Sequence, residues 1–147
     1  MIPRYNWRQM TPSSFESVKR VAQAFVNAIN HHSVAGIADL MTEDHLFIDS
    51  LGMRTGGKQA MKAAWEGYFR IVPDYTIVIE ETFVDAAETV MLGTAGGTYS
   101  MDGVLLPENK WSTPAAFRAL TRGPLVAEWR VYADNEPIRQ IIARHRQ

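Results

Sequence analysis

The chain has 147 residues, of which 46% are hydrophobic and 10% aromatic, and it contains no cysteine. A chain of this length buries about two-thirds of its unfolded surface without disulfides or metals, so we expect one domain over residues 1–147. The formal net charge is −1, and the interspersed acids and bases form no electrostatic footprint for nucleic acid or an anionic membrane. The lack of cysteine excludes disulfide, thiolate and zinc–thiolate chemistry and fits a reducing, cytoplasmic environment.

The start of the chain does not resemble a targeting segment. Residues 1–7 lack the basic and then apolar layout of a signal peptide, and no apolar run approaches the roughly 20 residues that span a bilayer. We therefore expect residues 1–12 to be an N-terminal extension of a cytoplasmic protein that binds no membrane.

The first helix has two possible starts. Thr11 before Pro12 can cap it, and Ser13 with Glu16 offers a capping box instead. Apolar residues then recur at spacings of three and four, which predicts one buried face. These residues are Val18, Val21, Ala22, Phe25, Val26 and Ile29.

The next elements are short. Ser33 can cap a second helix over residues 34–41. Residues 45–49 alternate as a strand, and a third helix begins after Gly57 and runs to about Val72, before Pro73.

The second half of the chain is a succession of strands. Turn residues separate the apolar, β-branched runs, and a long connection spans residues 101–110. The expected strands are residues 75–84, 89–100, 111–121 and 125–133, and a last helix occupies residues 135–147. Glycines 93, 96 and 97 lie inside a strand, where interior glycines mark bends.

Helices followed by antiparallel strands predict an α+β fold with the helices on one side of the sheet. A sheet that bends around helices encloses a cone, and such a cone can hold a small-molecule pocket.

Four segments of the chain resemble one family of proteins. They start at Phe25 in the first helix, at Phe47 in the first strand, at Tyr68 near the end of the third helix and at Glu128 in the last strand. They read FVNAIN, FIDSLG with Gly-Gly at 56–57, YF with PDY at 73–75, and EWRVYAD. Together they resemble the nuclear transport factor 2-like superfamily, and within it the SnoaL-like polyketide cyclase and ketosteroid isomerase branch, over residues 14–134.

This resemblance implies a cone-shaped fold. A strongly curved mixed or antiparallel sheet would wrap around three N-terminal helices, and the chain adds a C-terminal helix. Members often form homodimers. The family's chemistry implies a small hydrophobic ligand and no cofactor. The four histidines show no spacing typical of metal ligands, so we expect no metal.

Asp49 is the main candidate for catalysis. It ends a short apolar strand, where burial would raise the pKa of its carboxyl group and make it a usable proton acceptor. It also matches the general base of the isomerases that the chain resembles. The alternative is an aspartate that only turns the chain before Ser50-Leu51-Gly52.

The rest of the isomerase machinery is missing. The resemblance places Phe25 where the isomerases have a tyrosine, and Ala115 or Ala116 where they have a protonated aspartic acid. Loss of both oxyanion donors costs several kcal/mol, at roughly 3–4 kcal/mol per donor, which disfavours steroid isomerisation. The donors that could replace them are Tyr68, Tyr99 and Trp111.

The last strands also resemble the limonene-epoxide-hydrolase branch. That chemistry needs an aspartate where this chain has Val131, and it pairs the aspartate with an arginine and a second acid. The strand over residues 113–120 offers Arg118, and we expect no acid near it. Asp134, at the strand end, is the one acid available for a cyclase.

Aromatic residues form the expected pocket wall. Trp and Tyr can orient a ligand through their polar atoms, although plain core packing is the alternative. His45, on the same strand face as Asp49, could transfer protons or tune the pocket, or could be a partly exposed histidine at a strand start. The candidate ligand-binding residues are Phe25, Trp65, Tyr68, Tyr99, Trp111, Phe117 and Trp129.

The sequence therefore predicts a SnoaL-like domain with an apolar pocket. If it is an enzyme, it performs a cofactor-free isomerisation, cyclisation or dehydration with Asp49 as the general base. The alternative is a non-catalytic module for ligand binding or dimerisation. Glu128, Arg130 and Tyr132 share one face of the last strand, which we expect to form a two-fold homodimer.

Overall fold

The structure is a computed structural model and describes residues 12–146. Its helices are α1 (Pro12–Asn30), α2 (Val34–Asp39), α3 (Lys58–Ile71) and α4 (Glu136–His145), with a 3₁₀ turn, η2 (Pro107–Asn109). Its strands are β1 (Met41–Ile48), β2 (Arg54–Gly56), β3 (Thr76–Asp85), β4 (Glu88–Thr98), β5 (Lys110–Arg122) and β6 (Leu125–Ala133).

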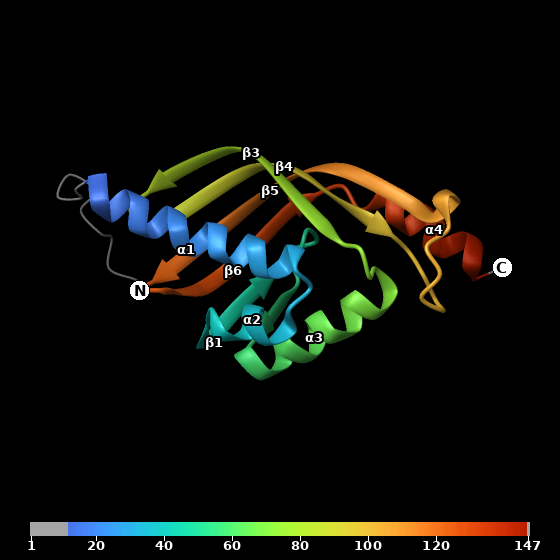
Figure 1. Ribbon diagram of the computed structural model, residues 1–147, viewed down its shortest axis with the longest axis horizontal. Helices are drawn as coiled ribbons and strands as arrows, with labels where there is room; N and C mark the ends of the chain where they lie inside the picture. Colours follow the sequence, from blue (N-terminus) through green and yellow to red (C-terminus); the bar gives the residue numbers. More distant parts are fainter. Residues whose placement is uncertain (1–11, 147) are drawn as a thin grey trace.

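Within the described residues the strands form one mixed sheet in the order β2-β1-β6-β5-β4-β3. The pair β1–β6 is parallel, and all other neighbouring pairs are antiparallel. The sheet curves, α1 runs across its inner face, and α3 lies along β1 and β2 (Figure 1). The predicted cone-shaped α+β fold is confirmed.

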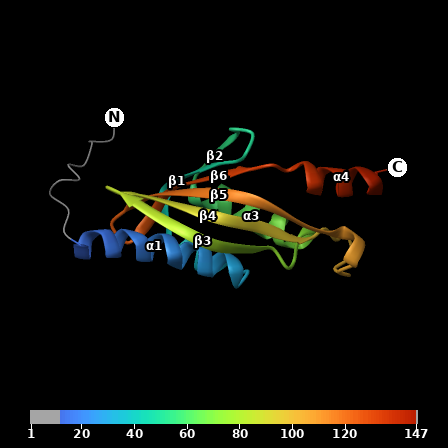
Figure 2. The same ribbon diagram turned by 90° about the horizontal axis from the view of Figure 1, so that it is seen from above.

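Helix α4 lies away from the other helices. It follows β6 at one end of the long axis, beside the connection between β4 and β5 (Figure 2). Arg144 Nη2 donates to the carbonyl oxygen of Glu108 at 3.0 Å, and a ring nitrogen of His145 lies 3.1 Å from Asn109 Oδ1. The buried Ile138 and Ile141 join α4 to the hydrophobic core.

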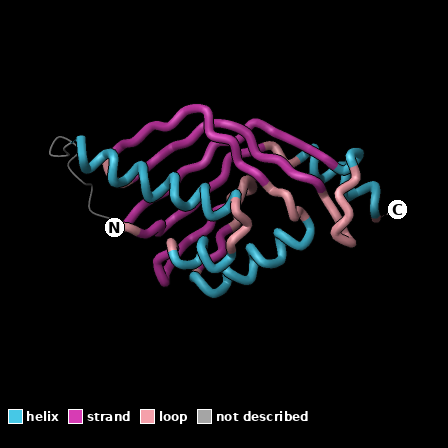
Figure 3. The backbone as a smooth tube through the Cα atoms, in the orientation of Figure 1, coloured by secondary structure: helices cyan, strands magenta, loops and turns pink. Residues whose placement is uncertain are grey.

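The core lies between the inner face of the sheet and the first three helices (Figure 3). Alternate residues of β5, from Trp111 to Thr121, are buried, whereas the residues between them are at least partly exposed. This period of two is the pattern of a strand with one face on the core.

The first half of the chain departs from the expectation at two points. Met41 begins β1 rather than ending a helix, so this strand is longer than the predicted 45–49 segment. The short strand β2 pairs with β1 where only a turn was expected. The predicted cap of the first helix at Thr11 lies outside the described residues.

The predicted cap of the second helix is confirmed. The Ser33 side chain accepts a hydrogen bond from Gly36 N at 3.0 Å, at the start of α2.

Strand β3 contains a bulge opposite a glycine. The register of β3 against β4 shifts between Ile79 and Glu81, next to Gly93. A Cβ atom at Gly93 would lie 1.8 Å from the carbonyl oxygen of Val78. Only glycine allows the two backbones to approach this closely.

None of the helices in the described part of the chain is long and apolar enough to cross a membrane.

Replacing Gly93 by alanine should destabilise the protein by roughly 1–3 kcal/mol, because the added Cβ would overlap the backbone of β3. The matched control is Gly67→Ala in α3, where a Cβ meets nothing within 4 Å. That change should stabilise the helix by about 0.5–1 kcal/mol. Urea unfolding of both variants measures the difference, and a Gly93→Ala variant as stable as the wild type would contradict the proposed close approach.

Candidate functional site

Five aromatic residues from α3, the α3–β3 turn and β5 pack together on the inner face of the sheet. We call them the α3–β5 cluster: Trp65, Tyr68, Phe69, Tyr75 and Trp111. The Tyr75 ring centroid lies 5.0 Å from that of Tyr68, 6.4 Å from that of Trp65 and 6.4 Å from that of Trp111. Tyr75 is therefore at the centre of the group.

The α3–β5 cluster carries hydrogen-bond donors in an apolar setting. The indole nitrogens of Trp65 and Trp111 are buried, and neither has a hydrogen-bond acceptor among the described residues. Burial raises the pKa of the Tyr68 and Tyr75 phenols, so both hydroxyl groups stay protonated at physiological pH. Such a group of neutral donors suits a ligand with a hydrogen-bond acceptor, such as a carbonyl oxygen.

A second group lies deeper in the core and consists of Phe25, His45, Phe117 and Trp129. The ring centroids of Phe25 and Trp129 are 4.9 Å apart, those of Phe117 and Trp129 are 5.4 Å apart, and that of His45 is 5.8 Å from Phe25. We call this group the His45 cluster. All four side chains are almost completely buried.

His45 is held in one orientation. Its Nδ1 lies 2.7 Å from the carbonyl oxygen of Val126, so Nδ1 carries the proton, and Nε2 is a buried acceptor without a partner among the described residues. Desolvation lowers the pKa of the imidazole, which favours the neutral form. The alternative of a partly exposed histidine is wrong, because His45 has no exposed surface. A neutral histidine with a free Nε2 can accept a proton.

Asp49 lies directly after β1, and its carboxylate is used in the following turn. Oδ1 accepts hydrogen bonds from the backbone N–H groups of Leu51 and Met53, both at 2.9 Å. The side chain is partly exposed. This geometry matches the turn-forming alternative, and the second carboxylate oxygen, Oδ2, is the one left to act on a ligand.

The candidate wall residues thus separate into two groups. Trp65, Tyr68 and Trp111 lie in the α3–β5 cluster, and Phe25, Phe117 and Trp129 lie in the His45 cluster. Tyr99 belongs to neither, since its ring packs 5.4 Å from His145 of α4. Tyr75 was not among the predicted wall residues, although its place after Pro73-Asp74, close to the aromatic pair Tyr68-Phe69, was a usable signal.

The positions where related enzymes carry acids lie in β5, in β6 and directly after β6. Ala115, not Ala116, faces the core. Val131 also packs against the core, and Asp134 Oδ1 accepts from the backbone N–H of Glu136 at the start of α4, at 2.9 Å. Ala115 and Val131 therefore remain apolar where the compared enzymes have an acid, and the Asp134 carboxylate is engaged at the start of α4.

The expectation that Arg118 has no nearby acid is wrong. Arg118 forms ion pairs with Glu88 and with Glu128, the latter at 3.6 Å, because β4 and β6 flank its strand. The hydrogen bond with Glu88 raises the pKa of the guanidinium group. These three residues lie on the outer face of the sheet and do not reach the inner clusters.

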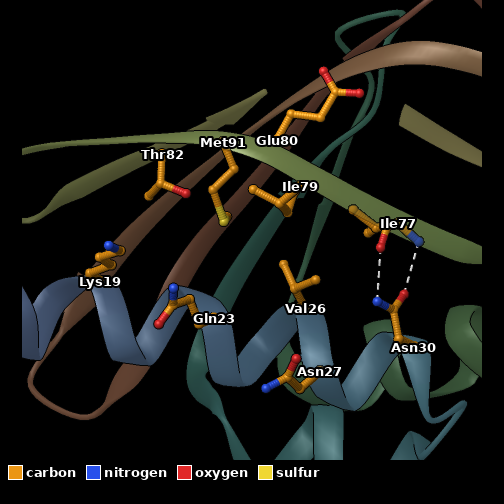
Figure 4. A pocket seen from close by; sticks show the side chains of 10 residues that line it. All are labelled: Lys19, Gln23, Val26, Asn27, Asn30, Ile77, Ile79, Glu80, Thr82 and Met91. Carbon is orange, nitrogen blue, oxygen red and sulfur yellow. Dashed lines mark hydrogen bonds between the residues drawn. The ribbon is translucent and has the colours of Figure 1, made fainter. Parts of the chain in front are cut away.

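A separate groove lies between α1 and the edge strand β3 (Figure 4). It has a volume of about 560 Å³. Lys19, Gln23 and Asn27 line its helical side, and Ile79 and Thr82 line the strand side. None of the predicted site residues lines this groove. We call it the α1–β3 groove.

Among the described residues, no three His, Asp or Glu side chains come together as metal ligands.

The lowered pKa of His45 predicts a pH-dependent stability. Above the unfolded-state pKa of about 6.5, His45 is neutral in both states and costs no stability. As the pH falls below that value, protons bind preferentially to the unfolded state, so the free energy of unfolding decreases. We expect His45→Gln to lose less unfolding free energy than the wild type between pH 7.5 and pH 5. The control is the exposed His31, whose Gln variant should behave as the wild type does. Equal slopes for all three proteins in urea unfolding would contradict a buried, neutral His45.

Solved structures with the same fold extend over most of the chain. A candidate SnoaL-like polyketide cyclase from Shewanella putrefaciens CN-32 is 16% identical, with a TM-score of 0.74 over 92% of this chain and 99% of that chain. A candidate polyketide cyclase from Xanthomonas campestris pv. campestris is 14% identical, with a TM-score of 0.75 over 86% of this chain and 98% of that chain.

An LEH-like epoxide hydrolase from M. tuberculosis is 15% identical, with a TM-score of 0.72 over 88% of this chain and 92% of that chain. At these identities the likeness shows a common fold. A search of curated proteins found no match. The family model of the SnoaL-like domain matches residues 22–139. That match covers most of the chain and confirms the family resemblance, so the chain belongs to the SnoaL-like domain family.

Proposed function

We propose that this SnoaL-like domain binds a small, mainly apolar molecule that presents a carbonyl or similar acceptor to the α3–β5 cluster. The observation that carries the proposal is the pair of buried indole N–H groups, from Trp65 and Trp111, around the central Tyr75. The aromatic rings supply the apolar surface, and the indole and phenol groups supply orientation.

The cost of burying the indole N–H groups of Trp65 and Trp111 favours a ligand with a hydrogen-bond acceptor. A buried donor without a partner costs about 1–3 kcal/mol, so two of them are a large cost for one small cluster. A ligand oxygen that accepts from these groups would recover that free energy on binding. A purely hydrocarbon ligand would not recover it, which makes the proposal testable by comparing matched ligands.

If the domain turns its ligand over, we propose a cofactor-free proton transfer such as isomerisation, intramolecular aldol closure or dehydration. Asp49 remains the base proposed from the family resemblance. His45 is a second candidate, because its Nε2 is free and its tautomer is fixed. The donors of the α3–β5 cluster would then stabilise the negative charge that develops on the carbonyl oxygen.

A thermal-shift screen with matched pairs tests the binding proposal. Each ketone, from small ketones to steroids, terpenoids and polyketides, is paired with the hydrocarbon of the same skeleton. We expect each ketone to stabilise the wild type more than its hydrocarbon does. Trp111→Phe should lower the affinity for the ketone roughly tenfold relative to the hydrocarbon, which corresponds to about 1.4 kcal/mol for one hydrogen bond. Phe69→Leu, which removes no donor, is the control.

Equal stabilisation by both members of every pair, or an advantage that Trp111→Phe leaves unchanged, would rule out the cluster as an acceptor site. For a ligand that is turned over, Asp49→Asn and His45→Gln identify the base. The variant that abolishes turnover and leaves binding intact marks the proton acceptor, since the base acts in the transition state rather than in ligand binding.

A non-catalytic binding module is the second candidate function. Phe25 and Ala115 lack the donors of the isomerases, and the Asp49 carboxylate is engaged in a turn. Binding of a ketone without turnover, unaffected by Asp49→Asn and by His45→Gln, would support this function over the enzyme. The cysteine-free composition supports a cytoplasmic location for either one.

We also propose a two-fold homodimer through the outer face of the sheet, the face opposite α1 to α3. Tyr132 and Leu92 are exposed there beside a hollow of about 430 Å³. The guanidinium of Arg130 lies 4.8 Å from the centre of the Tyr132 ring. Exposed Tyr and Arg side chains next to apolar surface are typical of protein interfaces.

Light scattering at micromolar concentration should give the mass of a dimer. Tyr132→Glu should weaken the dimer at least tenfold, because it places a charge in the centre of the contact. Leu51→Glu is the control, since Leu51 is exposed in the β1–β2 turn, away from this face. A monomeric mass for the wild type would overturn the proposal.

A further inference from the structure

The turn after α1 contains a histidine in a backbone conformation that usually belongs to glycine. His32 has a φ of 54°. Its backbone N–H donates to the carbonyl oxygen of Ile29 at 2.9 Å, and the N–H of Ser33 donates to that of Ala28 at 3.2 Å. This pair of bonds forms a Schellman ending, in which the left-handed residue is most often glycine, because a side chain adds strain there. The helix end alone therefore gives no reason for a histidine at this position.

The side chain of His32 contacts the α3–β5 cluster at two points. Its Nε2 lies 2.7 Å from the carbonyl oxygen of Tyr75, 43 residues later in the chain. A carbonyl oxygen can only accept, so Nε2 carries the proton and donates the hydrogen bond. The imidazole ring also packs against Phe69 of α3 in an edge geometry, with ring centroids 5.1 Å apart. His32 thus joins the end of α1 to two members of the cluster.

Tyr75, the central residue of the cluster, lies between α3 and β3 and belongs to neither element. Its backbone N–H donates to the carbonyl oxygen of Val72 at 3.2 Å, and its carbonyl oxygen accepts from His32. Two residues later, the Asn30 side chain donates to the carbonyl oxygen of Ile77 at 2.9 Å and accepts from its N–H at 2.8 Å (Figure 4). The end of α1 therefore holds the start of β3 through the side chains of Asn30 and His32, and the His32 bond acts on Tyr75 itself.

The place of Tyr75 decides the geometry of the donors around it. Its ring centroid is 6.4 Å from that of Trp65 and 6.4 Å from that of Trp111, whose indole N–H groups are buried without acceptors among the described residues. Because the Tyr75 ring is buried and closely packed, a shift of its backbone carries the ring with it. A hydrogen bond weakens steeply as its angle and length depart from the optimum, so such a shift would impair donation to a ligand oxygen.

We infer that His32 is a positioning residue for the acceptor site. Its Nε2–H bond to the Tyr75 carbonyl oxygen fixes the ring around which the donors of Trp65 and Trp111 are arranged. His32 acts through Tyr75 and does not contact the ligand. The inference rests on the function proposed for the α3–β5 cluster. The alternative is a purely structural role, in which the bond stabilises the fold and has no effect on the donors.

Three substitutions of His32 separate the effect of the donor from that of the backbone strain. His32→Leu removes the donor and keeps an apolar side chain beside Phe69. His32→Gln retains an N–H donor at a similar reach. His32→Gly removes the side chain and relieves the strain of the left-handed conformation. His31→Leu is the control, because the exposed His31 ring lies 2.7 Å from the carbonyl oxygen of Asn27 in its own helix.

The first measurement needs no ligand. In ¹H–¹⁵N spectra of the isotope-labelled full chain, His32→Leu and His32→Gly should shift the indole signals of Trp65 and Trp111. His32→Gln should return both signals toward their wild-type positions, and Trp129, in the His45 cluster, should move little. The indole signals of His31→Leu should match those of the wild type. His32→Gly should unfold at a higher urea concentration than His32→Leu, because glycine adopts this φ without strain.

The second measurement is the preference for 2-indanone over indane in thermal-shift titrations. His32→Leu and His32→Gly should both reduce this preference about fivefold, the effect of one hydrogen bond that is no longer aligned. His32→Gln and His31→Leu should retain it. Because His32→Leu and His32→Gly differ in stability, an equal loss of preference in both cannot come from stability alone.

Unchanged indole signals and an unchanged ketone preference in both His32→Leu and His32→Gly would overturn the inference and leave the structural role. A loss that His32→Gln does not reverse would also overturn it, because the loss would then not come from the missing donor. If the wild type prefers no ketone over its hydrocarbon, the function proposed for the cluster fails instead. The ligand-free spectra then still decide whether His32 positions the indole groups.

Discussion

The close approach of the end of α3 to β4 holds the aromatic cluster together. A Cβ atom at Gly97 would lie 2.5 Å from Val72 Cγ1, so glycine is required where the helix end meets the strand. Next to it, Asp74 accepts hydrogen bonds from the backbone N–H of Thr98 at 2.6 Å and from its hydroxyl at 2.7 Å. These contacts fix Tyr75 between α3 and β5, and the rings of the α3–β5 cluster pack around it.

The inner face of the sheet therefore holds two kinds of polar group. His45 Nδ1 is bonded to Val126 and is oriented by it, whereas His45 Nε2 and the indole N–H groups of Trp65 and Trp111 lack partners among the described residues. Buried polar atoms normally have partners, so unpartnered ones mark the places where a ligand or water belongs. By contrast, Asp49 and Asp134 are engaged by backbone N–H groups, and this engagement stabilises a turn and a helix start.

Local patterns were sufficient to predict most of the fold. The alternation in residues 111–121 and the spacing of apolar residues in the first helix depend on nearby residues alone, and the structure confirms both elements. The burial of His45 was not predictable in this way, because a register shift between Met41 and Leu46 breaks the alternation of β1. The acids beside Arg118 come from neighbouring strands, so their pairing depends on sheet order.

The candidate site was predictable only in part, for the same reason. Residue type and the expected helix or strand face were sufficient to predict that Trp65, Tyr68 and Trp111 face inward. Their grouping around Tyr75, and the separate grouping around His45, depend on how α1 and α3 cross the sheet. The α1–β3 groove depends on the separation of a helix and an edge strand that are almost 50 residues apart in the chain, as in the Asn30–Ile77 contact.

The most direct test of the acceptor site is a ¹H–¹⁵N spectrum of the tryptophan indole groups during titration with a ketone that stabilises the protein. The chain has four tryptophans, and the signals of Trp65 and Trp111 are assigned with their Phe variants. Our account predicts that these two signals shift together as their N–H groups donate to the carbonyl oxygen, while Trp129 moves little. Binding that shifts other resonances and leaves both of these indole signals unchanged would contradict it.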